Sequence, residues 1–251
     1  MRTATLACLT AAATIVVACA SPDPGAASRD SAAARARIET IVASADRSDA
    51  DRKNDVRRKP VELLAFTGVR PGMTVLDVSS GGGYTTELLA RAVAPGGRVY
   101  AQTPRPPSPA LAARLQKPVA ADVTSVVRPF ESAPPTEAAG RLDLVTLMFN
   151  YHDMGHLGVD RARLNAAVFA ALKPGGSYVI ADHSGRAGTG ISESGTLHRV
   201  EEALVRREVE AAGFRLVAEG AFLRNPNDPR DREEPEPPQP KDEFVLRFVK
   251  P

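Results

Sequence analysis

The chain has 251 residues and a formal net charge of +2, from 32 basic and 30 acidic residues. It shows no basic patch of the kind that binds nucleic acid, and it has no Trp and only 5% aromatic residues for base stacking. The composition therefore excludes a nucleic-acid partner and fits one α/β domain with a short N-terminal extension.

The first residues are typical of an export signal. Arg2 precedes an apolar run, residues 6–18, that is too short to span a bilayer. The run ends in the letters VVAC at Cys19, the pattern of a bacterial lipobox. We therefore expect a signal peptide over residues 1–18, lipidation of Cys19 and anchoring in the cell envelope. Because Ala20 rather than Asp follows the cysteine, the periplasmic side of the outer membrane is favoured. An ordinary signal peptide cut elsewhere, or an unprocessed cytoplasmic chain, is the alternative.

The segment after the lipobox is rich in Ser, Pro, Gly and Ala and predicts a flexible tether over residues 19–35. This leaves residues 36–251 for the folded domain, whose first helical spacing of apolar residues begins at Ile38. A charged stretch follows, and its Arg57 and Arg58 would contact an acidic substrate if the N-terminal helices covered the pocket.

From residue 74 onward, apolar β-branched runs alternate with helical segments. The expected strands are 75–78, 98–102, 123–127, 142–149, 178–181, 216–223 and 244–248. The expected helices are 85–94, 110–115, 161–172 and 197–212. Strands separated in this way predict an α/β fold with a parallel sheet and helices on both faces. The last two strands lack a helix between them and should pair antiparallel. His198 and Arg199 would occupy the first turn of the last helix.

Ligands of an open α/β sheet bind beyond the carboxyl ends of its strands. This rule selects residues 79–83, 102–105, 128–131, 150–155 and 182–185 without any motif. The Pro-rich loop over residues 224–241 leaves from the same end of the sheet, so it could form a mobile lid.

The first of these segments is a glycine turn. Gly81, Gly82 and Gly83 let the backbone approach a ligand closely, and the helix that follows favours an anionic group at its N-terminus. Asp77 could receive a cationic group, so a zwitterionic amino acid moiety would fit. The sequence has no P-loop, and Thr86 stands where a dinucleotide fingerprint needs a glycine or alanine. A tight turn without a ligand is the alternative.

These residues resemble the class I S-adenosylmethionine-dependent methyltransferases. The glycine motif of that family, D-x-G-x-G-x-G, reads here from Asp77 to Gly83. Two further hallmarks are LKPGG at residues 172–176 and EAAGF at residues 210–214. The chain also resembles a group of bacterial predicted methyltransferases that carry NYHD, here residues 150–153, followed by DHS. The resemblance implies a Rossmann-like sheet with an antiparallel last strand, S-adenosylmethionine as cofactor and a small-molecule acceptor of unknown identity.

The resemblance also implies a cofactor site, with departures from the family pattern. The expected residues are Asp77, Ser79, Gly81, Gly82, Gly83, Gln102 and Asn150. Ser79 replaces the first glycine of the motif, and Gln102 stands where most members hold the cofactor ribose with an acid. An amide makes weaker hydrogen bonds than a carboxylate. A non-catalytic, ligand-binding lipoprotein with a degenerate methyltransferase fold is therefore the second interpretation.

Catalytic side chains are expected at the ends of two strands. His152 or His183 would serve as a general base, with Asp153 or Asp182 orienting it. The alternative is that each histidine caps a helix or bonds a loop carbonyl. We expect no metal, because the sequence shows no recognised ligand spacing. The oligomeric state is left open.

Overall fold

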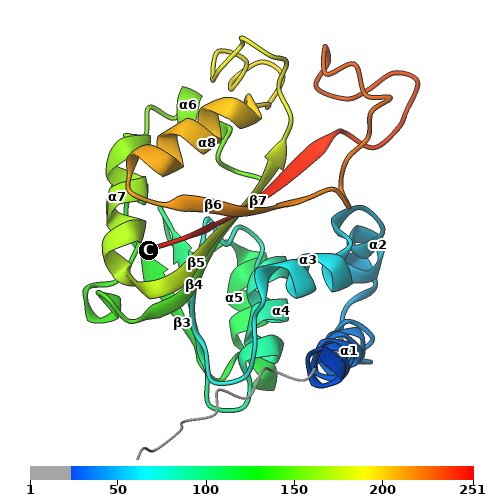
Figure 1. Cartoon of the computed structure of the whole chain (residues 1–251), viewed down its shortest axis with the longest axis vertical. Coiled ribbons are helices and arrows are strands. Elements are labelled where there is room, and N and C mark those ends of the chain that lie inside the picture. The colour runs from blue at the N-terminus through cyan, green and yellow to red at the C-terminus, as the bar shows by residue number, and fades with distance from the viewer. Residues whose placement is uncertain (1–23) are drawn as a thin grey trace, which may run out of the picture.

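A computed structural model describes residues 24–251, so Cys19 and the expected signal peptide lie outside the described residues. Seven strands form one sheet in the order β3-β2-β1-β4-β5-β7-β6 (Figure 1). They are β1 (Thr74–Val78), β2 (Arg98–Thr103), β3 (Val123–Val127), β4 (Leu142–Met148), β5 (Leu172–His183), β6 (Arg215–Gly220) and β7 (Glu243–Val249). Only β7 runs antiparallel to its neighbours β5 and β6 in this sheet, which confirms the expected topology.

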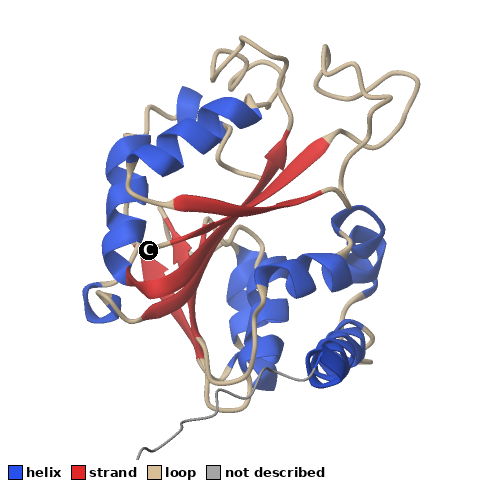
Figure 2. Cartoon of the chain, viewed as in Figure 1, coloured by secondary structure: helices blue, strands red, loops and turns tan. Residues whose placement is uncertain are grey.

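Helices cover both faces of the sheet (Figure 2). They are α1 (Pro24–Val42), α2 (Asp49–Arg58), α3 (Pro60–Thr67), α4 (Tyr84–Val93), α5 (Pro109–Leu115), α6 (Asp153–His156), α7 (Arg161–Ala171) and α8 (Glu202–Ala211), with 3-10 turns at Pro118–Ala120, Phe130–Ser132 and Thr136–Ala138. One apolar core packs α7 and α8 against the sheet, and a second packs α1, α3 and α4 against the opposite face. The central strands β4 and β5 are therefore apolar on both faces, as buried parallel strands require.

The carboxyl ends of β1 to β5 meet at one edge of the sheet, and β7 begins at the same edge because it runs antiparallel. Its first residue, Glu243, pairs in register with His183, the last residue of β5. Side chains from distant parts of the sequence are thereby brought together at this edge.

The structure corrects the expected starts of two helices. Helix α1 begins at Pro24, inside the stretch assigned to a tether, because the alanines that follow are strong helix formers. Helix α8 begins at Glu202 rather than at residue 197, because His198 adopts a left-handed φ of 50° and Val200 forms a β-bridge with Ser184. Across residues 24–251, no helix is both long and apolar enough to cross a membrane.

Candidate functional site at the carboxyl edge of the sheet

The glycine turn between β1 and α4 combines packing with open space. Gly83 has a φ of 81°, and an added Cβ would lie 2.8 Å from Arg114 Cδ and 2.9 Å from Leu111 Cδ1. Gly83 is thus required for the contact of the turn with α5. Gly81, with a φ of 55°, differs because its added Cβ would find only Ser79 O, at 3.8 Å. The space beside Gly81 is therefore free for a ligand.

Asp77 lies behind this turn and holds it in place. It is 1% exposed, and its two oxygens accept hydrogen bonds from the hydroxyls of Thr86 and Thr146 at 2.6 Å and 2.8 Å. Burial raises the pKa of Asp77 to about 6, although these hydrogen bonds oppose the shift. These two contacts hold the turn in place. They occupy both oxygens of Asp77, which was expected to receive a cationic group of the ligand.

The structure also corrects the role expected for Gln102. This side chain is fully buried, and both halves of its amide are already bonded within the protein. Its oxygen accepts from the Ser79 backbone N–H at 2.9 Å, and its nitrogen donates to the Arg128 carbonyl at 2.7 Å. Gln102 therefore ties the ends of β1, β2 and β3 together instead of presenting its amide to a ribose.

A cavity of about 810 Å³ opens at the glycine turn. Its walls come from Ser79–Gly82, from the first residues of α4 and α5, from the end of β4 at Asn150, and from one side of α2. Of the N-terminal helices in the described chain, α2 is therefore the one that lines the pocket. The loop 224–241 supplies none of these described wall residues, so the structure gives no support to its expected role as a lid over this cavity.

Helix α2 gives the cavity a cationic wall, which consists of Lys53, Arg57 and Arg58. The guanidinium of Arg58 lies 3.7 Å from the ring centroid of Phe149, and its buried Nε has no hydrogen-bond partner within residues 24–251. Burial, together with the neighbouring Arg57, lowers the pKa of Arg58 to about 10. Arg57 instead donates to Glu243 at 2.7 Å. Arg58 is thus a cation still available to an anionic ligand.

Backbone strain gathers around the same cavity. Five non-glycine residues within the described chain have a positive φ, and three of them, Ser79, Phe149 and His198, lie at the carboxyl edge of the sheet. A bulky aromatic residue such as Phe149, with a φ of 58°, rarely adopts this conformation. Such outliers concentrate at functional sites, where the surrounding packing holds them.

The four expected catalytic residues, His152, Asp153, Asp182 and His183, come together next to the cavity. Nδ1 of His152 lies 2.6 Å from Asp182 Oδ1, and its Nε2 lies 3.1 Å from Asp153 Oδ1. The same Asp153 oxygen lies 3.0 Å from Nδ1 of His198. Asp182 also accepts from the backbone N–H groups of His152 and His183, which fixes its position.

The carboxylates control the protonation of His152. Burial lowers the pKa of this imidazole, but the attraction of Asp182 and the hydrogen bonds to Asp153 and Asp182 outweigh burial and raise the pKa to about 9. Burial likewise acts to raise the pKa of Asp153, yet His152 and His198 bring it down to about 2. With the pKa raised in this way, His152 does not fit the expected role of a general base at neutral pH.

His183 has a different environment. Its Nδ1 lies 3.0 Å from Glu243 Oε1, and burial lowers its pKa below the ordinary value of 6.5. The ring lies 5.7 Å from that of Phe149, which lines the cavity. Sequence reasoning missed Glu243 because it follows a long loop, and only the antiparallel register of β7 places it beside His183.

A chain of hydrogen bonds joins the glycine turn to the histidines. Ser79 Oγ donates to Asn150 Oδ1 at 2.6 Å, and Asn150 Nδ2 donates to Asp153 Oδ2 at 2.6 Å. Asn150 also lines the cavity, where sequence reasoning expected a cofactor contact. The hydroxyl of Ser79, which departs from the family glycine, is what makes this connection possible.

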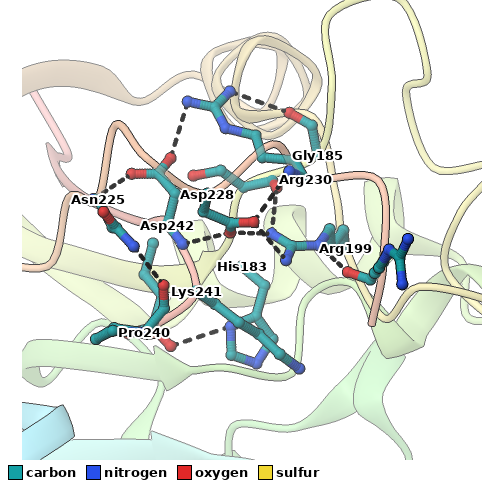
Figure 3. A network of polar contacts seen from close by, with 12 residues as sticks. His183, Gly185, Arg199, Asn225, Asp228, Arg230, Pro240, Lys241 and Asp242 are labelled. Atoms are coloured by element: carbon teal, nitrogen blue, oxygen red, sulfur yellow. Dashed lines mark hydrogen bonds and ion pairs between the residues drawn. The ribbon is translucent and has the colours of Figure 1, made fainter. Parts of the chain in front are cut away.

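The loop 224–241 is held at its base by a buried ion pair (Figure 3). Arg199, fully buried, lies 2.9 Å from Asp228 Oδ2, and Asp228 accepts from the backbone N–H groups of Arg230 and Asp242. Arg199 was expected in the first turn of a helix and instead anchors this loop. A buried charge is retained where a partner satisfies it.

The comparisons with known proteins agree with this geometry. Residues 76–180 match a family model described as a methyltransferase domain. A stretch of 39 residues is 54% identical to a protein-L-isoaspartate O-methyltransferase of Aeropyrum pernix and covers 16% of this chain and 15% of that relative. The match thus spans a small part of that protein's length.

Solved structures share the fold. A SAM dependent methyltransferase from Aquifex aeolicus is 19% identical, with 86% of this chain and 98% of that one covered and a TM-score of 0.60. A geranyl diphosphate C-methyltransferase from Streptomyces coelicolor is 13% identical, with 84% and 88% covered and a TM-score of 0.58. A [4+2]-cyclase also matches, at 17% identity, with 80% and 81% covered and a TM-score of 0.58. Fold alone therefore does not fix the reaction.

Proposed function

We propose that this chain, which carries a class I methyltransferase domain, uses S-adenosylmethionine to methylate a small molecule bound beside α2. The observation that carries the proposal is the cavity of about 810 Å³ at the carboxyl edge of the sheet, which opens onto the glycine turn. A ligand site is expected at this position of a doubly wound sheet.

The residues of the turn fit the cofactor. The free space at Gly81 admits a ligand close to the backbone, and the N-terminus of α4 attracts a carboxylate. S-adenosylmethionine supplies the sulfonium from which the methyl group is displaced. The protein's own task is then to hold donor and acceptor in line and to take up a proton where the acceptor loses one.

His183 is the residue that we propose for the proton. Its ring lies behind Phe149, which is a wall residue of the cavity, and Glu243 Oε1 lies 3.0 Å from its Nδ1 and can orient it. As the bond from sulfur to the methyl group breaks and the bond to the acceptor forms, the acceptor's proton would pass to this imidazole. His152 is not proposed for this role, because carboxylates contact both of its ring nitrogens.

Calorimetric titration with S-adenosylmethionine and S-adenosylhomocysteine tests the cofactor assignment. Gly81→Asn should abolish micromolar binding, because Asn tolerates a left-handed φ while its side chain occupies the free space. Gly72→Asn is the matched control, since Gly72 has a φ of 81°, an added Cβ meets nothing within 4 Å, and the residue does not line the cavity. No binding by the unaltered protein at millimolar ligand would contradict the assignment.

The cationic wall should receive an anionic group. The open question is whether this group is the carboxylate of the cofactor or an acidic group of the acceptor. Replacing the unpaired guanidinium in Arg58→Gln decides between them. A roughly tenfold loss of S-adenosylhomocysteine affinity, about 1.4 kcal/mol, assigns the wall to the cofactor, and unchanged affinity assigns it to the acceptor.

We also propose that the protein is exported and lipid-anchored in the bacterial cell envelope. The proposal rests on the apolar run of residues 6–18, which ends in the letters VVAC at Cys19. Mass spectrometry of the protein from membranes should find acylated Cys19 at the mature N-terminus. An intact Met1, or cleavage at another position, would refute it.

A ligand-binding protein without catalysis is the second candidate. Gln102 favours this candidate, because the family places an acid that binds the ribose at this position. The Gln102 amide instead makes both of its hydrogen bonds within the protein. Incubation with labelled S-adenosylmethionine and a small-molecule extract separates the two candidates. Formation of S-adenosylhomocysteine, lost in Gly81→Asn, indicates an enzyme, whereas binding without turnover indicates a binding protein.

A further inference from the structure

All four histidines of the chain gather at the carboxyl edge of the sheet. They come from three segments, since His152 and His156 lie at the two ends of α6 while His183 and His198 lie farther along the chain, yet the neighbouring rings of this group have centroids only 5.3 to 5.7 Å apart. Asp153 lies among them, and its Oδ1 is 3.1 Å from His152 Nε2, 3.0 Å from His198 Nδ1 and 3.9 Å from His156 Nδ1. Several imidazole nitrogens thus converge on one carboxylate oxygen.

We propose that His152, Asp153 and His198 form a binding site for one divalent transition-metal ion. Their three donor atoms lie within 4.8 Å of one another. Ligands at about 2.0 to 2.2 Å from a zinc-like ion stand roughly 3 to 3.5 Å apart, which is close to the two separations measured from Asp153 Oδ1. Two imidazoles and one carboxylate leave further coordination positions open, and they favour zinc, cobalt, nickel or iron over magnesium and calcium.

The surroundings of the three ligands are arranged as they are around metal centres. Asp182 Oδ1 lies 2.6 Å from His152 Nδ1, and this contact places the ring proton on Nδ1 and turns Nε2 toward the site. Asn150 donates to Asp153 Oδ2 at 2.6 Å, which leaves Oδ1 for the ion. Such carboxylate–histidine contacts orient ligands and raise their basicity.

The site has an entry path and a strained ligand. The His152 side chain is 5% exposed, whereas Asp153 and His198 are 23% and 37% exposed, so an ion can reach the site from the side of His198. His198 has a φ of 50°, and this left-handed conformation is part of what places its ring opposite Asp153. Strain of this kind is tolerated where a site uses it.

His156 does not belong to the proposed ligand set. Ser194 Oγ gives its proton to the His152 carbonyl, so at 3.0 Å it accepts a hydrogen bond from His156 Nδ1. This nitrogen is therefore protonated and unavailable to a metal. His156 offers a control residue within the same cluster.

The inference is independent of the proposed methyltransferase reaction, because metal binding is measured without cofactor or acceptor. The site nevertheless lies one hydrogen bond from Asn150, which lines the cavity. A bound ion would therefore sit close to the Asn150 wall of the cavity.

The test is titration of the full chain, stripped with a chelator, with Zn²⁺ by calorimetry and with Co²⁺ by absorption of the bound ion. One ion per chain should bind, and His198→Asn should weaken binding by at least about tenfold, since even the loss of a supporting contact costs 10- to 100-fold. Asn suits the left-handed backbone at this position, so the fold should persist, as checked by thermal melting.

His156→Asn is the matched variant and should retain affinity within about threefold, well below the effect of losing a ligand. The proposal is overturned if the unaltered chain binds neither ion at millimolar concentration. It is equally overturned if His198→Asn binds as tightly as the unaltered chain, or if His156→Asn loses as much affinity as His198→Asn. In the last case the ligand set would be wrong.

Discussion

The two roles considered for Gln102 make opposite predictions for Gln102→Glu. If the side chain faced the ribose, the new carboxylate would strengthen cofactor binding and leave stability unchanged. In the structure, the substituted atom faces the Arg128 carbonyl at 2.7 Å in a fully buried position. A carboxylate oxygen at this position would face the Arg128 carbonyl oxygen with no proton between the two acceptors. It would also bury a negative charge.

The cost follows from these contacts. Losing a buried hydrogen-bond partner costs about 1–3 kcal/mol, and more where a charged group is involved, so we expect about 3 kcal/mol at neutral pH. For a domain of this size, that lowers Tm by about 6–12 °C. The introduced carboxyl has a folded pKa above its unfolded value of about 4.3, because only its protonated form donates to Arg128. Its destabilisation is therefore absent below about pH 4 and grows as the pH rises to about 6.5.

Thermal melting of Gln102→Glu from pH 4 to pH 7 measures this effect. Gln116→Glu is the control, because Gln116 is exposed at the end of α5 and the same change there should cost less than about 0.5 kcal/mol. A Gln102→Glu protein with unchanged Tm at pH 7 and tighter S-adenosylhomocysteine binding would refute the role that the structure gives to Gln102.

Three further predictions concern the glycine turn. Gly83→Ala should lose about 2–4 kcal/mol in urea unfolding, because its φ of 81° and the contact with Arg114 both oppose a side chain. Asp77 has a folded pKa near 6, above its unfolded value, so stability should fall by up to about 3 kcal/mol as pH rises from 4 to 6, and Asp77→Asn should remove that slope. Ser79→Gly should leave the Tm nearly unchanged, since relief of left-handed strain, about 1–2 kcal/mol, offsets the lost hydrogen bond to Asn150. Ser79→Ala loses the same hydrogen bond but keeps the strain, so its Tm should be lower.

The sheet could be predicted because local patterns determine it. Runs such as 123–127 and 142–149 appear in the structure as β3 and β4 within one residue, and the missing helix before residue 244 correctly indicated an antiparallel last strand. The start of α8 was wrong because the apolar spacing of residues 197–212 continues across His198, whose left-handed backbone depends on tertiary contacts.

The site could be predicted only as a set of strand ends. The rule of carboxyl ends selected residues 79–83, 150–155 and 182–185, and their side chains do meet. It could not give the partners. Glu243 reaches His183 through the register of β7, and His198 reaches Asp153 across 45 positions of sequence.

Ser79 shows why departures from a family motif require a structural reading. By sequence alone, a serine in place of the first glycine suggests a degraded cofactor turn. In the structure, the same serine has a mildly strained, left-handed backbone. Its hydroxyl connects the turn, through Asn150, to the Asp153 carboxylate, which contacts His152 and His198. A glycine could not make this connection, because it has no side-chain donor. A ligand that displaced the Ser79 hydroxyl would remove the hydrogen bond that orients the Asn150 amide, whose nitrogen in turn bonds Asp153 Oδ2.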